Sequence, residues 1–161
     1  MLIDSRASFI KHYPEFNTLP VEQVIYAGGI VVQNGKVLVL KRAGADADSP
    51  EKWVLPGGKK DKFEAVEVAV LREVLEETGL QTKIICIAST FGYQVVKDDC
   101  VRDTTQINFA LVIVGKVKVV LSDEHDRFAW LTLAEVQDSS LSAEVKSGIE
   151  IALHIKAKLL G

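Results

Sequence analysis

The segment REVLEETG, residues Arg72 to Gly79, carries three glutamates within five positions. At about 100° per residue, Glu73, Glu76 and Glu77 point from one side of a helix. Like charges three or four residues apart repel each other there by roughly 0.2 to 0.5 kcal/mol per pair, and Arg72 supplies a single positive charge at the edge. Closely spaced anionic oxygens are the ligands that Mg²⁺ or Mn²⁺ prefers, so the pattern favours a divalent metal site. The isolated fragment would also fit an ordinary solvated acidic face.

The helix that carries these acids is predicted from about Glu64 to Thr78, with Gly79 as its C-terminal stop. Its core-facing stripe is expected on the side opposite the acids and consists of Val68, Leu71, Val74, Leu75 and Thr78. Apolar residues also border the acids themselves, namely Val66, Ala69 and Val70. The acidic side is therefore not expected to be simply open to water.

Upstream of this helix, two β-rich runs flank the turn dipeptide Asn34-Gly35. Residues 24–33 and 36–42 therefore predict a β-hairpin. A short strand is expected at residues 53–55, and Pro56-Gly57-Gly58 is expected to end it.

Downstream, residues 82–96 and 104–114 read as long strands separated by the polar stretch KDDCVRD. Further strands are predicted at 116–121 and 127–131, and an amphipathic helix at 143–160. Many strands with two main helices among them predict an α+β fold or a mixed-sheet sandwich rather than a regular βαβ array.

With 161 residues, 48% of them hydrophobic, the chain is long enough for one domain with a substantial core. We expect an N-terminal appendage at residues 1–23, helical in part at 5–13, followed by the domain at 24–161. The two cysteines, Cys86 and Cys100, have neither CxxC spacing nor a nearby histidine, so we interpret them as reduced thiols.

The formal net charge of -3 gives no electrostatic footprint for duplex nucleic acid. The N-terminal residues lack the pattern of a secretory signal, and no run of about 18 apolar residues could span a bilayer. The expected partner is thus a small molecule rather than duplex nucleic acid or a membrane, and the expected location is cytoplasmic. The oligomeric state, monomer or homodimer, stays open.

The stretch that begins at Gly58 resembles the Nudix box, because every fixed position of that motif is filled. Gly58 is followed after five residues by Glu64, and after seven more by Arg72-Glu73-Val74, a free position, Glu76-Glu77, another free position, Gly79 and Leu80. The preceding hairpin, WVLPGG and FAWLTLAEV resemble the rest of a Nudix hydrolase, so the resemblance covers roughly residues 24–160. One departure is Phe63, where many relatives have glycine. In addition, Lys59, Lys60 and Lys62 make this loop unusually basic and could attract polyphosphate.

The resemblance implies an α/β/α sandwich around a mixed β-sheet, in which the box forms a loop–helix–loop. It also implies a pyrophosphohydrolase that cleaves a nucleoside diphosphate linked to another group, by attack of water on phosphorus. Mg²⁺ or Mn²⁺ would be bound by Glu73, Glu76 and Glu77, with the Gly58 carbonyl as an additional ligand. One of the glutamates would also take the proton of the water, and Arg72 would orient a neighbouring glutamate.

Outside the box, Arg42 and Lys59 match positions that often meet substrate phosphates in Nudix relatives; the alternative is that both are solvated surface cations. Another metal-binding carboxylate is expected from the SDEHDRFAW segment; Glu124 is the first candidate, ahead of Asp123 and Asp126. Tyr93 is the preferred base-stacking residue among the strand aromatics, which also include Tyr26, Phe91 and Phe109.

The resemblance leaves three substrate classes open: nucleoside triphosphates, dinucleoside polyphosphates and nucleotide sugars. The alternative function is a nucleotide-sensing module that uses the same pocket without turnover.

Overall fold

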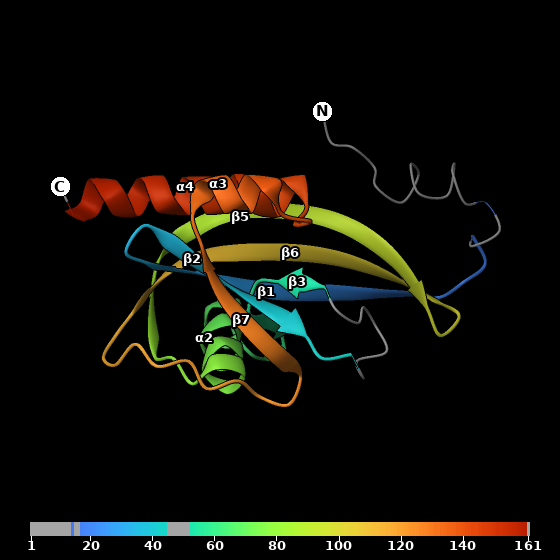
Figure 1. Ribbon diagram of the computed structural model, residues 1–161. Helices are drawn as coiled ribbons and strands as arrows, with labels where there is room; N and C mark the ends of the chain where they lie inside the picture. The colour runs from blue at the N-terminus through green and yellow to red at the C-terminus, as the bar shows by residue number, and fades with distance from the viewer. Residues whose placement is uncertain (1–13, 15–16, 45–51, 161) are drawn as a thin grey trace.

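The computed structural model describes residues 14, 17–44 and 52–160 as a mixed seven-stranded sheet with helices on both faces (Figure 1). The strands are β1 (Val21–Gln33), β2 (Lys36–Arg42), β3 (Trp53–Val54), β4 (Gly57–Lys59), β5 (Thr82–Lys97), β6 (Cys100–Ile113) and β7 (His125–Leu131). The helices are α2 (Val66–Thr78), α3 (Leu133–Asp138) and α4 (Ala143–Leu160).

The sheet has the strand order β3-β2-β1-β6-β5, with β4 also paired to β1 and β7 to β2. Only β1 and β6 are parallel; the other pairs are antiparallel. The predicted hairpin is present, but β1 and β2 pair only at Val32–Val37 and Gln33–Lys36, next to the turn. Beyond that point they separate: β4 pairs with β1 at 26–28, and β7 pairs along β2. This separation brings the Pro56-Gly57-Gly58 segment against the middle of β1.

Two apolar layers cover the sheet, which confirms the predicted α/β/α sandwich (Figure 1). On one face, α4 and α3 pack over a core that includes Ile30, Val39 and Ile149. On the other face, α2 packs over a core that includes Val31, Val74 and Phe109. Alternate residues of the central strands point to opposite faces, so β1 and β6 contribute to both cores.

Helix α2 matches the predicted helix, but the predicted core stripe is partly wrong. Val68 and Leu75 are 55% and 46% exposed, whereas Glu77 is only 5% exposed. Of the three acids, Glu77 is turned inward, and the buried residues of the helix are Ala69, Val70, Val74, Glu77 and Thr78. The burial of Ala69, Val70 and Glu77 agrees with the expectation that the acidic side is not simply open to water, but it leaves Val68 and Leu75 of the predicted core stripe in solvent. Gly79 ends the helix as predicted, with φ 69° and its N–H donated to the Leu75 carbonyl oxygen at 2.8 Å.

The stretch KDDCVRD does not separate two strands by a loop, as the sequence suggested. Strands β5 and β6 run through it and pair from Thr82–Ile113 to Lys97–Cys100. Only Asp98 and Asp99 form the turn, and both have positive φ, 52° and 54°. Aspartate tolerates this left-handed conformation, which a tight hairpin turn requires.

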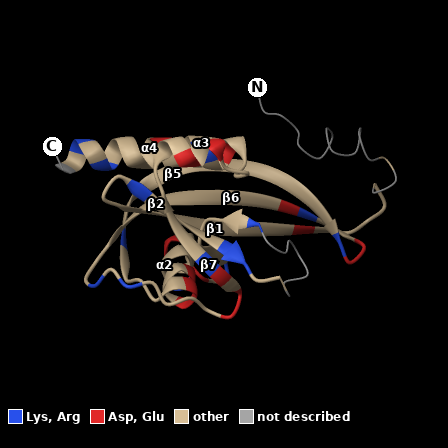
Figure 2. Ribbon diagram, in the orientation of Figure 1, with Lys and Arg blue, Asp and Glu red and all other residues tan. Residues whose placement is uncertain are grey.

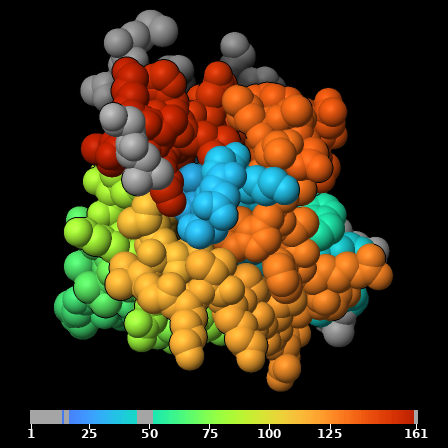
Figure 3. All heavy atoms as spheres, turned by 60° about the vertical axis from the view of Figure 1, so that its left-hand side comes forward, coloured from blue at the N-terminus to red at the C-terminus, as the bar shows by residue number. Residues whose placement is uncertain are grey.

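The strand predicted at 116–121 is absent, because this segment has no strand to pair with. It forms an extended connection in which Val119 and Leu121 pack against the α2-side core. Its backbone N–H groups at Val120 and Ser122 donate to the carbonyl oxygens of Thr78 and Glu77, at 2.8 and 3.2 Å. Figure 3 shows part of this connection at the surface beside the β1–β2 turn.

Four further features differ from the predictions. Gly57–Lys59 does not merely end a strand but forms β4. Helix α3 was missed, although Thr132 and Glu135 form the capping box that the sequence TLAE encodes. Strand β1 begins at Val21, inside the expected N-terminal appendage, whereas the expected helical segment at 5–13 lies outside the described residues. Helix α4 has the predicted bounds, and β7 begins two residues before the predicted strand at 127.

Phe63 occupies the left-handed region at φ 62°, and its side chain is fully exposed. The conformation is thus one that glycine adopts freely, and the ring has no packing to lose. We expect Phe63→Gly to raise the free energy of unfolding by roughly 0.5 kcal/mol, the relief of strain exceeding the added entropy of the unfolded chain. Urea denaturation measures this, with Lys62→Gly as the control that should lower stability. A variant less stable than wild type would show that the Phe63 ring has a stabilising contact.

Candidate functional site

Glu77 is the most deeply buried acid of the predicted metal site. Its Oε2 accepts a hydrogen bond from the backbone N–H of Gly57 at 2.8 Å, which joins α2 to β4. Burial, with smaller contributions from the charges of Glu73 and Glu124, raises the pKa of Glu77 to about 8, against the opposing effects of the Gly57 N–H and Arg42. The site thus holds an acid whose ionised form requires a nearby cation.

Glu73 and Arg72 belong to one hydrogen-bonded network with Glu64. The Arg72 guanidinium binds Glu64 through two hydrogen bonds, Nε to Oε1 at 2.8 Å and Nη2 to Oε2 at 3.0 Å. Its Nη1 donates to Glu73 Oε1 at 2.7 Å and lies 3.4 Å from Glu76 Oε2. The Arg72 bonds, with a bond from the Asp61 N–H, lower the pKa of Glu64 to about 2. Burial raises the pKa of Glu73 despite Arg72, so the arginine positions Glu73 without fully neutralising the site.

Gly57 and Gly58, the glycines at the start of the box, are explained by what surrounds them. A Cβ on Gly58 would lie 2.3 Å from the carboxyl carbon of Glu73. Gly57 has φ 155°, and a Cβ there would lie 2.3 Å from the carbonyl oxygen of Ala27. The Tyr26 hydroxyl donates to the Gly57 carbonyl oxygen at 2.7 Å. Glycine therefore lets the β4 backbone lie directly against both β1 and the acidic side of α2.

Glu124 lies in the segment before β7, where its carbonyl oxygen accepts a hydrogen bond from the Ala43 N–H at 2.9 Å. Its side chain is exposed, but its charge acts on both Glu73 and Glu77. Glu76 is also on the solvent side, with its side chain 60% exposed. Figure 2 shows the acidic residues on α2 and before β7, with basic residues at the end of β2.

The donor set fits a hard divalent cation, because it consists of carboxylate and carbonyl oxygens. Among the described residues, however, no three acidic, histidine or cysteine side chains are already arranged around one point as metal ligands. Glu73 is drawn toward Arg72 and Glu77 toward Gly57, so ion binding would require small side-chain rotations.

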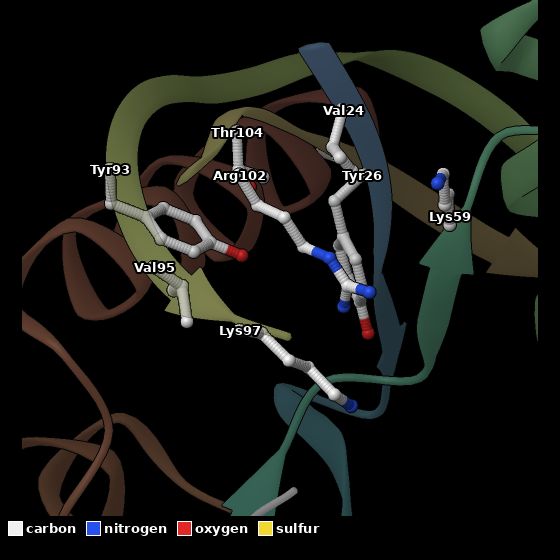
Figure 4. A pocket seen from close by; sticks show the side chains of 8 residues that line it. All are labelled: Val24, Tyr26, Lys59, Tyr93, Val95, Lys97, Arg102 and Thr104. Atoms are coloured by element: carbon white, nitrogen blue, oxygen red, sulfur yellow. The ribbon is translucent and has the colours of Figure 1, made fainter. Parts of the chain in front are cut away.

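Two cavities share Tyr26 and Tyr93, and the charges of Glu77 and Glu73 act on Tyr26. One, of about 370 Å³, is lined by the basic residues Lys59, Lys97 and Arg102 together with apolar strand residues (Figure 4). The other, of about 310 Å³, includes Arg42, Trp53, Leu55, Gln106, Leu141 and Val145. The structure thus brings the three predicted substrate residues, Arg42, Lys59 and Tyr93, to one pair of adjoining cavities.

Several contacts refine these predictions. Lys59 forms an ion pair with Glu22, while the charge of Arg42 acts on Glu77, Tyr26 and Tyr93. Arg42 therefore lies within electrostatic range of Glu77 and of both tyrosines. Of the other aromatics considered, Phe109 is buried in the α2-side core, and Phe91 packs on the opposite core with its ring 5.8 Å from Tyr93.

No sequence pattern predicts the remaining cavity residues, such as Lys97, Arg102 and Gln106, because strand pairing alone brings them together. Within the described part of the chain, no helix has the length and apolar character needed to cross a membrane.

The profile of the NUDIX domain family matches residues 24–150. A MutT-like protein of Streptomyces ambofaciens is 30% identical over 127 residues, which cover 77% of this chain and 73% of the relative. An RNA pyrophosphohydrolase of Bartonella tribocorum is 30% identical over 148 residues, covering 78% and 84%. The crystal structure of a MutT protein from Methanosarcina mazei superposes with a TM-score of 0.67 at 27% identity, covering 88% of this chain and 98% of that one. With the complete box and the matching fold, the chain belongs to the Nudix family and is a hydrolase.

Proposed function

We propose that the protein is a Mg²⁺- or Mn²⁺-dependent pyrophosphohydrolase that cleaves a nucleoside diphosphate linked to another group. The observation that carries this proposal is that Arg42 lines a cavity bordered by Tyr26 and Tyr93 and that its charge acts on the buried acid Glu77. Acids that need a cation thus adjoin a basic cleft large enough for part of a nucleotide. The relatives named above include a pyrophosphohydrolase, which supports this class of reaction.

The residues that would hold the metal are Glu73, Glu76 and Glu77, with the Gly58 carbonyl and Glu124 as further ligands. When bound, the ion neutralises phosphate oxygens and activates water. The three glutamates stand on one helix, so one of them can bind the ion while another accepts the proton of the attacking water at a carboxylate oxygen.

The chain's other residues fix these groups in place. Arg72 holds Glu73 through its bond at 2.7 Å and is itself held by the two bonds to Glu64. The Gly57 N–H holds Glu77, and Tyr26 fixes the Gly57 carbonyl. Arg42 and Lys59 are proposed to bind the phosphates, the lysine exchanging its exposed partner Glu22 for the substrate.

We expect hydrolysis of nucleoside diphosphate derivatives to require a divalent metal. Glu73→Gln and Glu77→Gln should each lower kcat/KM at least about a hundredfold, because both metal binding and charge neutralisation suffer. Glu67→Gln, at an exposed acid in the first turn of the same helix, is the matched control and should retain activity. The assay measures phosphate products from triphosphates, dinucleoside polyphosphates and nucleotide sugars with Mg²⁺, Mn²⁺ or chelator. Metal-independent turnover would contradict the proposal, and nucleotide binding without turnover would favour a sensor.

Gly58→Ala should reduce kcat by about tenfold or more, because the added methyl group displaces the Glu73 carboxylate from which it would lie 2.3 Å. Gly92→Ala is the control: its Cβ would meet only the Thr104 carbonyl oxygen, at 3.7 Å. Steady-state kinetics and thermal unfolding of both variants separate the site effect from a loss of folding. Equal activity of the two variants would show that the position of Glu73 does not limit catalysis.

A further inference from the structure

A chain of polar side chains crosses the core on the face covered by α4. Asn108 on β6 is fully buried, and its Nδ2 donates to Ser89 Oγ on β5 at 3.1 Å. Its Oδ1 accepts a hydrogen bond from Gln106 Nε2 at 2.9 Å. Its neighbours on the same face of β1 and β6, Ile30 and Ala110, belong to the apolar core. A buried amide in such surroundings is costly unless it is fully paired, so an apolar residue would be the simpler choice for stability.

The backbone around this chain leaves room for it at two points. A Cβ on Gly28, which pairs with Asn108 in the β1–β6 register, would lie 2.2 Å from Asn108 Oδ1 and 3.4 Å from Gln106 Nε2. A Cβ on Gly148 of α4 would lie 2.4 Å from Ser89 Oγ. Both glycines have negative or extended φ, so no turn requires them. Their absent side chains make space for the polar chain.

The hydrogen-bonded row of side chains Ser89, Asn108 and Gln106 ends at a cavity. Gln106 lines the 310 Å³ cavity next to Tyr26, its register partner on the adjacent strand β1. The walls of this cavity include Trp53, Leu55, Leu141 and Val145, and it is also lined by Arg42, whose charge acts on Glu77. Flat or apolar walls, one fixed amide and a cation toward the reaction site are the features needed to hold a nucleobase with its phosphates directed at the metal ligands.

We propose that this cavity holds the nucleobase of the substrate and that Gln106 determines which base is accepted. The proposal rests on the proposed hydrolysis of nucleotides. One N–H of Gln106 is used by Asn108, which leaves its second N–H and its Oε1 for the base. A base edge with a neighbouring acceptor and donor pairs with such an amide through two hydrogen bonds. Asn108 and Ser89 are positioning residues, because they fix the orientation of the Gln106 amide.

The test compares kcat/KM for ATP, GTP, CTP and UTP, and for ribose 5′-triphosphate, which has no base. Wild type should show unequal efficiencies on the four nucleotides. In Gln106→Leu the ratio between the best and the worst nucleotide should fall by about 5- to 100-fold, the discrimination expected of a pair of hydrogen bonds. Hydrolysis of ribose 5′-triphosphate should not change. Thr105→Val is the control, because Thr105 is exposed and its side chain lies on the opposite face of β6; the ratio should be that of wild type.

The positioning role of Asn108 and Ser89 is tested separately, through KM. Asn108→Leu should raise KM for the preferred nucleotide while leaving kcat and the base-free substrate unchanged, since the freed Gln106 amide no longer holds one orientation. If this core variant does not fold, Ser89→Ala should shift KM in the same direction by a smaller factor.

Equal losses on all five substrates would overturn the proposal, because they would show a purely structural role for Gln106. The absence of any base preference in wild type would also overturn it. If wild type hydrolyses none of the five, it is the proposed function on triphosphates that fails. In that case calorimetry measures Kd for the four nucleotides with wild type and Gln106→Leu. The ratio between the weakest and the tightest Kd should fall in the variant if Gln106 selects the base, and an unchanged ratio would overturn that role.

Discussion

The carboxylate of Glu77 is 5% exposed and accepts a hydrogen bond from the Gly57 N–H, and the other parts of the site are arranged around this contact. It holds the acidic side of α2 against β4 and so toward the sheet. Glu73, on the same helix, is half-buried, and its hydrogen bond from Arg72 balances part of its charge. Burial of like charges costs free energy. The network of Arg72 and Glu64 reduces that cost, and a divalent cation would offset the remainder.

The separation of β1 from β2 provides the space for this contact. After two paired residues the strands part, and β4 enters beside β1 while β7 follows β2. The acids of α2, which packs on one face of the sheet, thereby come within electrostatic reach of Arg42 and Tyr26, which border the cavities. Glycine at positions 57 and 58 permits the close approach. The position of the acids thus depends on a few backbone positions, where β1 and β2 separate and where glycine stands, rather than on the whole core.

Patterns of residues close together in the sequence predicted much of this arrangement. They predicted the Asn34-Gly35 turn, the helix end at Gly79, helix α4 and the spacing of the box glutamates. The errors arise where tertiary contacts decide. Leu75 faces solvent because Glu77 faces inward, and the β-rich residues at 116–121 form no strand because no partner strand is available. Gln106, Asn108 and Ser89 could not be identified from sequence, since only the register of β5, β6 and β1 makes them neighbours.

The central claim is that buried Glu77 creates the need for a cation, and unfolding of the metal-free protein between pH 5 and 8 tests it most directly. The pKa of Glu77 rises from its ordinary value of 4.5 to about 8 in the folded state. Between these values the unfolded chain loses a proton that the folded chain keeps, so stability should fall as pH rises, by up to about 1.4 kcal/mol per pH unit. Urea denaturation in chelator should show this fall in wild type and much less of it in Glu77→Gln, and Mn²⁺ should restore wild-type stability at pH 8. The same pH dependence in both proteins, with no stabilisation by Mn²⁺, would contradict the account.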